Sequence, residues 1–350
     1  MKFELSEDQA LLRQSTRDFL SSEWPAERAR KVMEHEPRGY EPADWQRLAE
    51  MGYLGLVLPA SVGGQGLGAI ELAIVLEEAG RACMPGPYLD AVLAAATLAA
   101  AGGQEELLAD ISAGKRLVTL AREDAPFRGS KLTPTRCEGG RVRGTKYFVP
   151  FAAQADALLV VAPDTLCLVH KPFKAVALPT IDPAQRFAEV TFDHAATAIG
   201  PASRLERVDR LAAVGASAML LGVMSRAMEM TLEYVQTRQA FKRPIGSFQA
   251  LQHRLADMLL KSESTRSAVY RAAWCFDTDN TDAPVACAAA KAYAGDAARL
   301  VCGESIQMHG GIGFTWELDL HFYFKRAKTL EQFYGSTEVQ LEQALAAAGF

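Results

Sequence analysis

The sequence lacks long apolar runs and long basic runs. Its longest apolar stretches in 350 residues, 91–101 and 211–224, are too short to cross a bilayer core of about 30 Å as a helix. Lys and Arg never stand more than two in succession, and the net charge of −5 disfavours binding to a polyanion. We therefore expect neither a membrane-embedded segment nor a nucleic-acid partner.

The sequence also lacks a CxxC pair, and its first residues do not predict a secretory leader. The first residues, MKFELSEDQ, are charged throughout and have no apolar core of a signal peptide. There is no CxxC pair and no histidine at metal-ligand spacing from any cysteine. We expect a cytoplasmic protein without a metal site, with reduced and mostly buried cysteine thiols. The six cysteines are Cys83, Cys137, Cys167, Cys275, Cys287 and Cys302.

Residue patterns divide the chain into three regions, which predicts an α+β multidomain fold. Residues 1–114 show helical periods at about 6–21, 43–51, 69–82, 88–101 and 104–113, and the first helix starts with a Ser-x-x-Gln capping box at Ser6. Residues 115–201 consist of short β-branched or aromatic runs separated by Gly, Pro and Asp, which predicts an antiparallel sheet or small barrel.

Residues 202–350 return to a helical period. Long patterns at about 204–238, 245–275 and 282–308 are separated by short breaks, and a further pattern covers about 320–345. Four antiparallel helices joined by short loops predict a helical-bundle domain.

Three segments of this last region carry the most specific signal. They read RQAFKRPIGSFQALQ (238–252), QMHGGIGF (307–314) and KRAKTLEQFYGSTEVQ (325–340). Together they resemble the flavin-binding C-terminal domain of the acyl-CoA dehydrogenase family, and the helix–sheet–helix order extends the resemblance over the chain. The resemblance implies an acyl-CoA dehydrogenase fold, an FAD cofactor and an acyl-CoA substrate.

The resemblance also implies positions that contact FAD. An arginine in the first segment binds the pyrophosphate, since a planar guanidinium pairs bidentately with phosphate oxygens, and the second segment contacts the adenosine end. The implied cofactor residues are Arg238, Phe241, Gln249, Gln307, Gly310, Gly311, Ser336 and, as an aromatic wall, Phe148. Without the resemblance, the preferred interpretation of Arg238 is a cation at a helix C-terminus, and the two glycines could equally be a helix stop.

The usual base of the family is missing. A glutamate in the loop before Gly335, or on the long helix 26 positions before Arg238, takes the α-proton of the thioester while the β-hydride goes to flavin N5. These positions hold Tyr334 and Ala212 here. Tyrosine, with an ordinary pKa near 10, is a poor substitute, so we interpret Tyr334 as a packing residue.

The middle region departs from the family as well. The segments that cradle the isoalloxazine ring match Glu123-Asp124-Ala125 and Phe148-Val149-Pro150. Pro150 offers no hydroxyl and no backbone N–H. In the family, the arginine and the Gln-x-x-Gly-Gly segment of one subunit complete the FAD site of a neighbour. This chain keeps these residues, which would contact a neighbour's FAD. Most of the residues that would surround its own flavin ring are altered.

These observations lead to one main hypothesis and three alternatives. The chain acts in α,β-desaturation of an acyl-CoA with a related subunit that carries the base, as in heteromeric bacterial dehydrogenases; electron-transfer flavoprotein is a possible further partner. Alternatively, it is an autonomous homotetramer with a displaced acid (Asp209, Glu206 or Glu338), a non-redox thioester-binding or structural subunit, or a flavin monooxygenase. We expect surface or capping roles for His253, His309 and His321.

Overall fold

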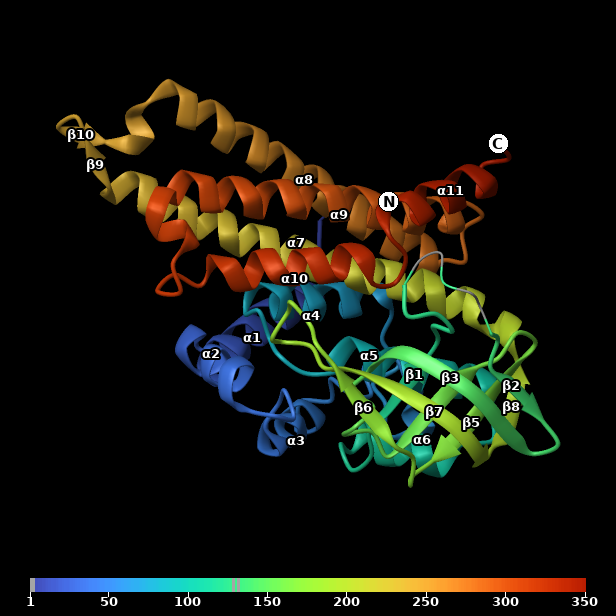
Figure 1. Cartoon of the computed structure of the whole chain (residues 1–350). Coiled ribbons are helices and arrows are strands. Elements are labelled where there is room, and N and C mark those ends of the chain that lie inside the picture. Colours follow the sequence, from blue (N-terminus) through green and yellow to red (C-terminus); the bar gives the residue numbers. More distant parts are fainter. Residues whose placement is uncertain (1–3, 128–129, 131–132) are drawn as a thin grey trace. The chain divides into compact units, whose positions relative to one another are not determined.

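The computed structural model describes residues 4–127, 130 and 133–350 (Figure 1). The helices are α1 (Glu7–Glu23), α2 (Ala26–His35), α3 (Pro42–Glu50), α4 (Ala69–Arg81), α5 (Tyr88–Ala101), α6 (Glu105–Ser112), α7 (Leu205–Thr237), α8 (Gln249–Asp277), α9 (Ala283–His309), α10 (Leu320–Gln332) and α11 (Thr337–Ala347), with short 3₁₀ turns η1 (Ala60–Val62), η2 (Ala202–Arg204), η3 (Ile245–Ser247) and η4 (Gly310–Phe314). The strands are β1 (Val118–Ala121), β2 (Arg136–Glu138), β3 (Arg141–Pro150), β4 (Ala157–Val161), β5 (Thr165–His170), β6 (Ala175–Leu178), β7 (Phe187–Ala195), β8 (Thr197–Pro201), β9 (Gln239–Ala240) and β10 (Arg243–Pro244).

The chain forms two compact units. Unit 1 combines the segment up to Lys31 with Gly68–Met84 and Arg210–Phe350, and unit 2 combines Val32–Leu67 with Pro85–Asp209. Both units are therefore assembled from segments far apart in the sequence. The boundaries 1–114, 115–201 and 202–350 remain a prediction.

Unit 1 is a helical bundle centred on α9. This helix packs against α8, α10 and α11, while α4 packs against α1 and α8 (Figure 1). The alanine-rich sequence of α9 explains its position, because small side chains let neighbouring helices approach on several faces. As expected, Ser6 and Gln9 form a capping box at the start of α1.

Glycines bring α4 and α7 close together within unit 1. A Cβ atom added at Gly222 would lie 1.8 Å from the backbone oxygen of Glu77, and one added at Gly80 would lie 2.2 Å from that of Met219. In the described part of the chain, the stretch Ala202–Thr237 alone is long and apolar enough to cross a membrane, and 89% of its most apolar window is buried inside the protein. Burial of this kind is typical of a core helix.

Unit 2 contains two four-stranded sheets. Their strand orders are β1-β4-β5-β8 and β2-β3-β7-β6, and α5 packs on β1. All pairs are antiparallel except β1–β4, which is parallel. The expected purely antiparallel sheet is therefore wrong in this one pairing. Strands β6 and β8 had not been predicted, because their short sequences AVAL and TAIGP alternate too little to be distinguished from loops.

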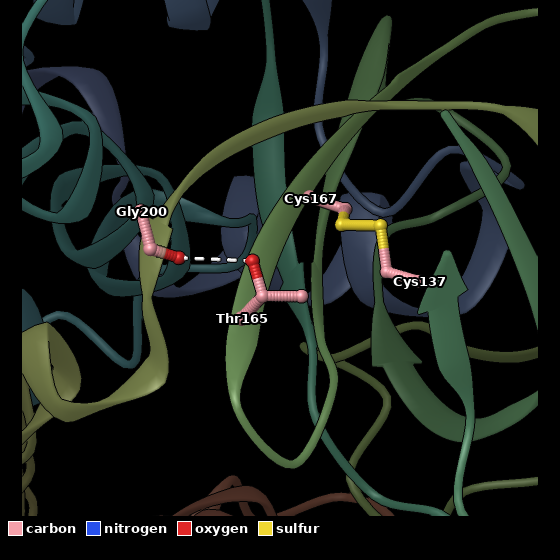
Figure 2. The surroundings of a disulfide bond; sticks show 4 residues. All are labelled: Cys137, Thr165, Cys167 and Gly200. Carbon is pink, nitrogen blue, oxygen red and sulfur yellow. Dashed lines mark hydrogen bonds between the residues drawn. A yellow bond between two sulfur atoms is a disulfide. The ribbon is translucent and has the colours of Figure 1, made fainter. Parts of the chain in front are cut away.

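A disulfide joins the two sheets of unit 2. Cys137 of β2 is bonded to Cys167 of β5, 30 positions later (Figure 2). Beside it, the Thr165 hydroxyl donates to the Gly200 carbonyl at 3.1 Å and ties β5 to β8. The expectation of reduced thiols is wrong for this pair, because β2 and β5 bring together two positions that the sequence separates. Cys83, Cys275, Cys287 and Cys302 form no disulfide in the described part of the chain and are buried, as expected.

Two helix predictions need correction. The expected helix over 320–345 is two helices, α10 and α11, because the backbone turns left-handed at Tyr334 (φ +61°) and Gly335 (φ +93°). Helix α2 had been missed, since its sequence is so rich in charge that its apolar positions are inconspicuous. One of the short runs in the predicted β region, KLTPTRC (131–137), lies partly outside the described residues, and within it β2 begins at Arg136.

Candidate functional site

The segment after α7 forms a projecting hairpin. Arg238 follows the last helical residue, and Phe241 and Lys242 form the tip between β9 and β10, with φ angles of +52° and +66° (Figure 1). Phe241 is 89% exposed, and Gln249, the first residue of α8, is exposed too. The exposed Arg238 side chain has no hydrogen-bond or ion-pair partner among the residues that the structure describes, so it does not cap the carbonyls of α7. Its guanidinium is available to an anion.

The end of α9 provides an open backbone turn. The N–H of Gly310 donates to the Gln307 carbonyl, and φ at Gly310 is +62°. A Cβ added at Gly310 or Gly311 would meet no atom within 4 Å. The Gln307 side chain is exposed. This turn therefore presents backbone and one amide to solvent, which suits close approach by a ligand.

These two motifs meet at one end of the bundle. The ring of Tyr234, one turn before Arg238, stacks on the His309 ring with centroids 4.3 Å apart, and the Tyr234 hydroxyl donates to the His309 carbonyl at 3.4 Å. His309 is only 4% exposed. Of the expected surface or capping role of His309, the surface part is therefore wrong, whereas its contact with the Ser305 carbonyl in the last turn of α9 fits a capping role. No pattern in the sequence indicated the contact with Tyr234, 75 positions away.

The loop between α10 and α11 is held by side chains from two helices. The Lys291 ammonium, fully buried on α9, donates to the carbonyls of Gly335 at 2.9 Å and Glu331 at 3.2 Å. The Gln340 amide donates to the Tyr334 carbonyl at 2.9 Å. Burial lowers the pKa of Lys291 to about 8. A lone lysine in the alanine-rich run ACAAAKAYAG was the sequence signal that could have identified this contact.

Ser336 follows in the same loop and caps α11. Its hydroxyl accepts from the Val339 N–H at 3.5 Å. Glu338, in the first turn of α11, is exposed. The loop thus places the hydroxyl of Ser336 against the helix end.

The two ends of the candidate site lie far apart within unit 1. Lys291, which touches the Tyr334 loop, and His309, which touches the Arg238 segment, are 18 positions apart on α9, or about 27 Å at 1.5 Å per residue. The structure therefore gathers Arg238, Gln307, Gly310 and Gly311 at one end of the bundle and leaves Tyr334 and Ser336 away from them.

The second base position lies in the apolar core. Ala212, near the start of α7, is 2% exposed, and an alanine there supplies no proton acceptor. Of the alternative acids, Asp209 forms an ion pair with Arg122 at 2.6 Å, and Glu206 is exposed. Neither base position of the family is therefore occupied by a carboxylate.

The two predicted flavin-cradling segments adjoin in unit 2. The N–H of Tyr147 donates to the Glu123 carbonyl at 2.8 Å. The buried Lys146 ammonium contacts the Asp124 carboxylate at 2.8 Å, and burial lowers the pKa of Lys146 although Asp124 opposes this shift. The Asp124 carboxylate therefore serves an internal ion pair.

Phe148 lies at an irregularity of the sheet beside this ion pair. The register between β3 and β7 shifts between Lys146 and Val149, and φ at Phe148 is +50°. Its ring packs edge-on against Phe187 with centroids 6.4 Å apart. A non-glycine residue with positive φ is uncommon and costs energy, so the surrounding sheet fixes this ring in place.

Known protein families and curated proteins show clear similarity to this chain. The models of the acyl-CoA dehydrogenase N-terminal and C-terminal domains match residues 6–110 and 210–349. "Acyl-CoA dehydrogenase IpdE2" of Mycolicibacterium smegmatis is 34% identical over 343 residues, covering 97% of this chain and 98% of the relative. The chain belongs to the acyl-CoA dehydrogenase family. Members of this family are FAD-dependent oxidoreductases that act on acyl-CoA, which confirms the predicted cofactor and enzyme class.

Solved structures agree with this assignment. The "Tcur3481-Tcur3483 steroid ACAD G363A variant" is 30% identical with a TM-score of 0.88, and 98% of both chains is covered. The "ChsE4-ChsE5 complex from Mycobacterium tuberculosis" is 28% identical with a TM-score of 0.89, and 99% of both chains is covered. The acyl-CoA dehydrogenase fold that the resemblance implied is confirmed.

Proposed function

We propose that this chain is the subunit without the base in a mixed, two-component acyl-CoA dehydrogenase. In this assembly, a related subunit carries the glutamate and the reacting flavin ring. This chain contributes Arg238, Gln307 and the Gly310–Gly311 turn to the pyrophosphate and adenosine end of that FAD. The reaction is the α,β-desaturation of a CoA thioester.

One observation carries the proposal: both base positions lack a carboxylate, whereas the residues proposed for the pyrophosphate and adenosine end of FAD are all present. Tyr334 and Ala212 stand where the family has glutamate. The exposed Arg238, whose side chain has no partner among the described residues, lies at the same end of the bundle as the open glycine turn. A base must be an acceptor with a pKa near the operating pH. Loss of the base together with retention of the anion site favours a supporting subunit.

FAD fits the residues at this end of the bundle. The Arg238 guanidinium has the planar donor geometry that suits a pyrophosphate, and backbone at Gly310 and Gly311 is open to close approach. When bound, FAD supplies the acceptor for the hydride that leaves the β-carbon. The exposed Phe241 and Gln249 flank the arginine segment and complete the proposed contact surface.

The residues of this chain expected around its own flavin ring suit it poorly in each unit taken by itself. In unit 2, Pro150 supplies no N–H and the Asp124 carboxylate is engaged by Lys146. In unit 1, the Ser336 hydroxyl is engaged as a helix cap. Phe148 remains as an aromatic wall. We therefore place the functional flavin in the related subunit.

The relatives support this assignment and suggest a substrate class. Two of the similar solved structures are named as pairs of different chains, Tcur3481-Tcur3483 and ChsE4-ChsE5, and the first is described as a steroid ACAD. We propose a heterotetramer of two chains of each kind in the cytoplasm, acting on the CoA thioester of a bulky, steroid-type acyl group. Electron-transfer flavoprotein is the proposed acceptor of the electrons.

Co-expression with related dehydrogenase genes, followed by a count of chains and flavins in the purified complex, tests the proposal. We expect one flavin per two chains and turnover of the acyl-CoA only in the mixed complex. One flavin per chain in a homotetramer that reduces an artificial acceptor would establish the autonomous alternative instead. A complex without flavin would establish the non-redox alternative.

A further inference from the structure

Two aromatic rings connect the two proposed cofactor-binding motifs. Tyr234 lies one turn before the end of α7, and its carbonyl accepts from the N–H of Arg238 at 2.8 Å. Its ring stacks on His309 with an angle of 24° between the planes. His309 in turn precedes Gly310 directly. The stack is thus joined to Arg238 on one side and to the glycine turn on the other.

The orientation of the His309 ring is fixed by a second contact. Its Nδ1 lies 2.7 Å from the Ser305 carbonyl, one turn earlier on α9. Because a carbonyl only accepts, Nδ1 carries the proton and donates. Burial lowers the pKa of His309, so the ring is neutral at neutral pH. A ring held by a hydrogen bond at its edge and by a stack on its face has little freedom to move.

The stack links two groups, Arg238 and the Gly310–Gly311 turn, whose spacing matters to a diphosphate that contacts both. The guanidinium of Arg238 and the open backbone at Gly310 and Gly311 reach solvent from different helices, 70 or more positions apart in sequence. A ligand that contacts both binds best when their spacing is set in advance, because ordering them on binding costs free energy. Within the described part of unit 1, the contacts between Tyr234 and His309 join these two motifs directly.

We infer that Tyr234 and His309 are positioning residues that set the spacing between Arg238 and the Gly310–Gly311 turn for the diphosphate of FAD. This inference rests on the proposed function, since it takes these motifs as the cofactor-binding end of the chain. Neither ring needs to touch FAD. An aromatic pair contributes about 0.5–1.5 kcal/mol, which corresponds to roughly a two- to tenfold change in affinity.

The test measures FAD affinity of the deflavinated mixed complex by titration with FAD and flavin fluorescence. We expect Tyr234→Ala and His309→Ala to raise the Kd for FAD about three- to tenfold. At saturating FAD, kcat and the KM for acyl-CoA should stay unchanged, because the reacting ring is remote from these residues. Tyr234→Phe, which keeps the ring, should bind FAD within twofold of the native complex.

A matched variant separates positioning from general stability. Tyr293, on the same helix as His309 but 16 positions earlier, contacts Lys261 of α8 through its ring at 5.1 Å. Tyr293→Ala should lower the Tm of the complex and leave the Kd for FAD unchanged. If Tyr234→Ala and His309→Ala raise the Kd no more than Tyr293→Ala does, the two rings have only a structural role and the inference is wrong.

Arg238→Ala distinguishes failure of this inference from failure of the proposed function. A raised Kd in Arg238→Ala with no change in the stack variants overturns the inference alone. An unchanged Kd in Arg238→Ala overturns the proposed function together with the inference. If the alanine variants do not fold, Tyr234→Leu and His309→Asn retain more volume and are subject to the same criteria.

Discussion

At the scale of single residues, Tyr334 lies in a loop whose backbone is held by two hydrogen bonds from side chains of other helices. Its backbone is left-handed, and its carbonyl and that of Gly335 both accept from buried side chains. Because we assign Tyr334 a packing role, Tyr334→Phe should change kcat of the mixed complex less than about twofold. Steady-state kinetics at several pH values check this. A loss of activity of about a hundredfold, the usual size of general-base effects, would show that the phenol takes the proton.

The burial of Lys291 makes the free energy of unfolding depend on pH. Burial lowers its pKa from 10.5 to about 8, so between these values the unfolded chain binds more protons than the folded one. The free energy of unfolding therefore rises with pH through this window. Relative to Lys291→Met, the native chain should gain about 2 kcal/mol from pH 7.5 to 9.5 in urea titrations.

An exposed lysine provides the comparison for this effect. Lys31→Met removes a charge at the surface of unit 1 and controls for the loss of a lysine. Curves for Lys291→Met that run parallel to those of the native chain would contradict the lowered pKa of Lys291.

At the scale of helices and strands, the approach of α4 to α7 depends on a missing side chain. A Cβ at Gly222 would lie 1.8 Å from the Glu77 carbonyl oxygen, which no rotamer change relieves. Gly222→Ala should therefore destabilise the protein by about 3 kcal/mol or more, since overpacking forces backbone shifts. Gly303→Ala is the matched control: its Cβ would meet only Phe324, at 3.8 Å. This change should stabilise α9 by up to about 1 kcal/mol, and equal Tm values for both variants would contradict the close approach.

Most helices of the protein were predictable from sequence. The breaks between α7, α8 and α9 were predicted, but the break at Tyr334 was not. The capping box at Ser6 and the long periods of α7, α8 and α9 predicted these helices because one local pattern fixes each of them. The break at Tyr334 was missed although Gly335 and Ser336 are a typical helix stop and N-cap. The apolar period runs across the break, and the hydrogen bonds from Lys291 that hold it come from a distant helix.

At the scale of the whole molecule, the sequence indicated the chemistry of the site better than its geometry. Arg238 and the Gln307 segment could be recognised from their residues, and the solvent-facing positions of both suit the predicted contacts. Their contact through Tyr234 and His309 could not be predicted, because stacking between helices leaves no period in a single sequence. The pairing of Cys137 with Cys167 was hidden for the same reason: it depends on how two sheets of unit 2 face each other.

This disulfide leads to a prediction about the protein as isolated from cells. After alkylation in denaturant without reductant, we expect four reactive thiols per chain, from Cys83, Cys275, Cys287 and Cys302, and two more after reduction. In the folded chain these four should react slowly because all four are buried. Burial also raises the pKa of Cys287 to about 12 and that of Cys302. Disulfides are rare in the reducing cytosol, so this count also bears on the proposed location.

Reduction of the disulfide should destabilise the protein without abolishing its assembly. Closing a loop of 30 positions restricts the unfolded chain by about 3.6 kcal/mol in the chain-entropy estimate. Cys137→Ser should therefore lower the Tm to about that of the reduced native protein, and reductant should have no further effect on the variant. Cys275→Ser, at a free cysteine of α8, controls for loss of a thiol and should keep the response to reductant. Six reactive thiols before reduction, with a Tm that is insensitive to reductant, would show that β2 and β5 are held together by packing alone.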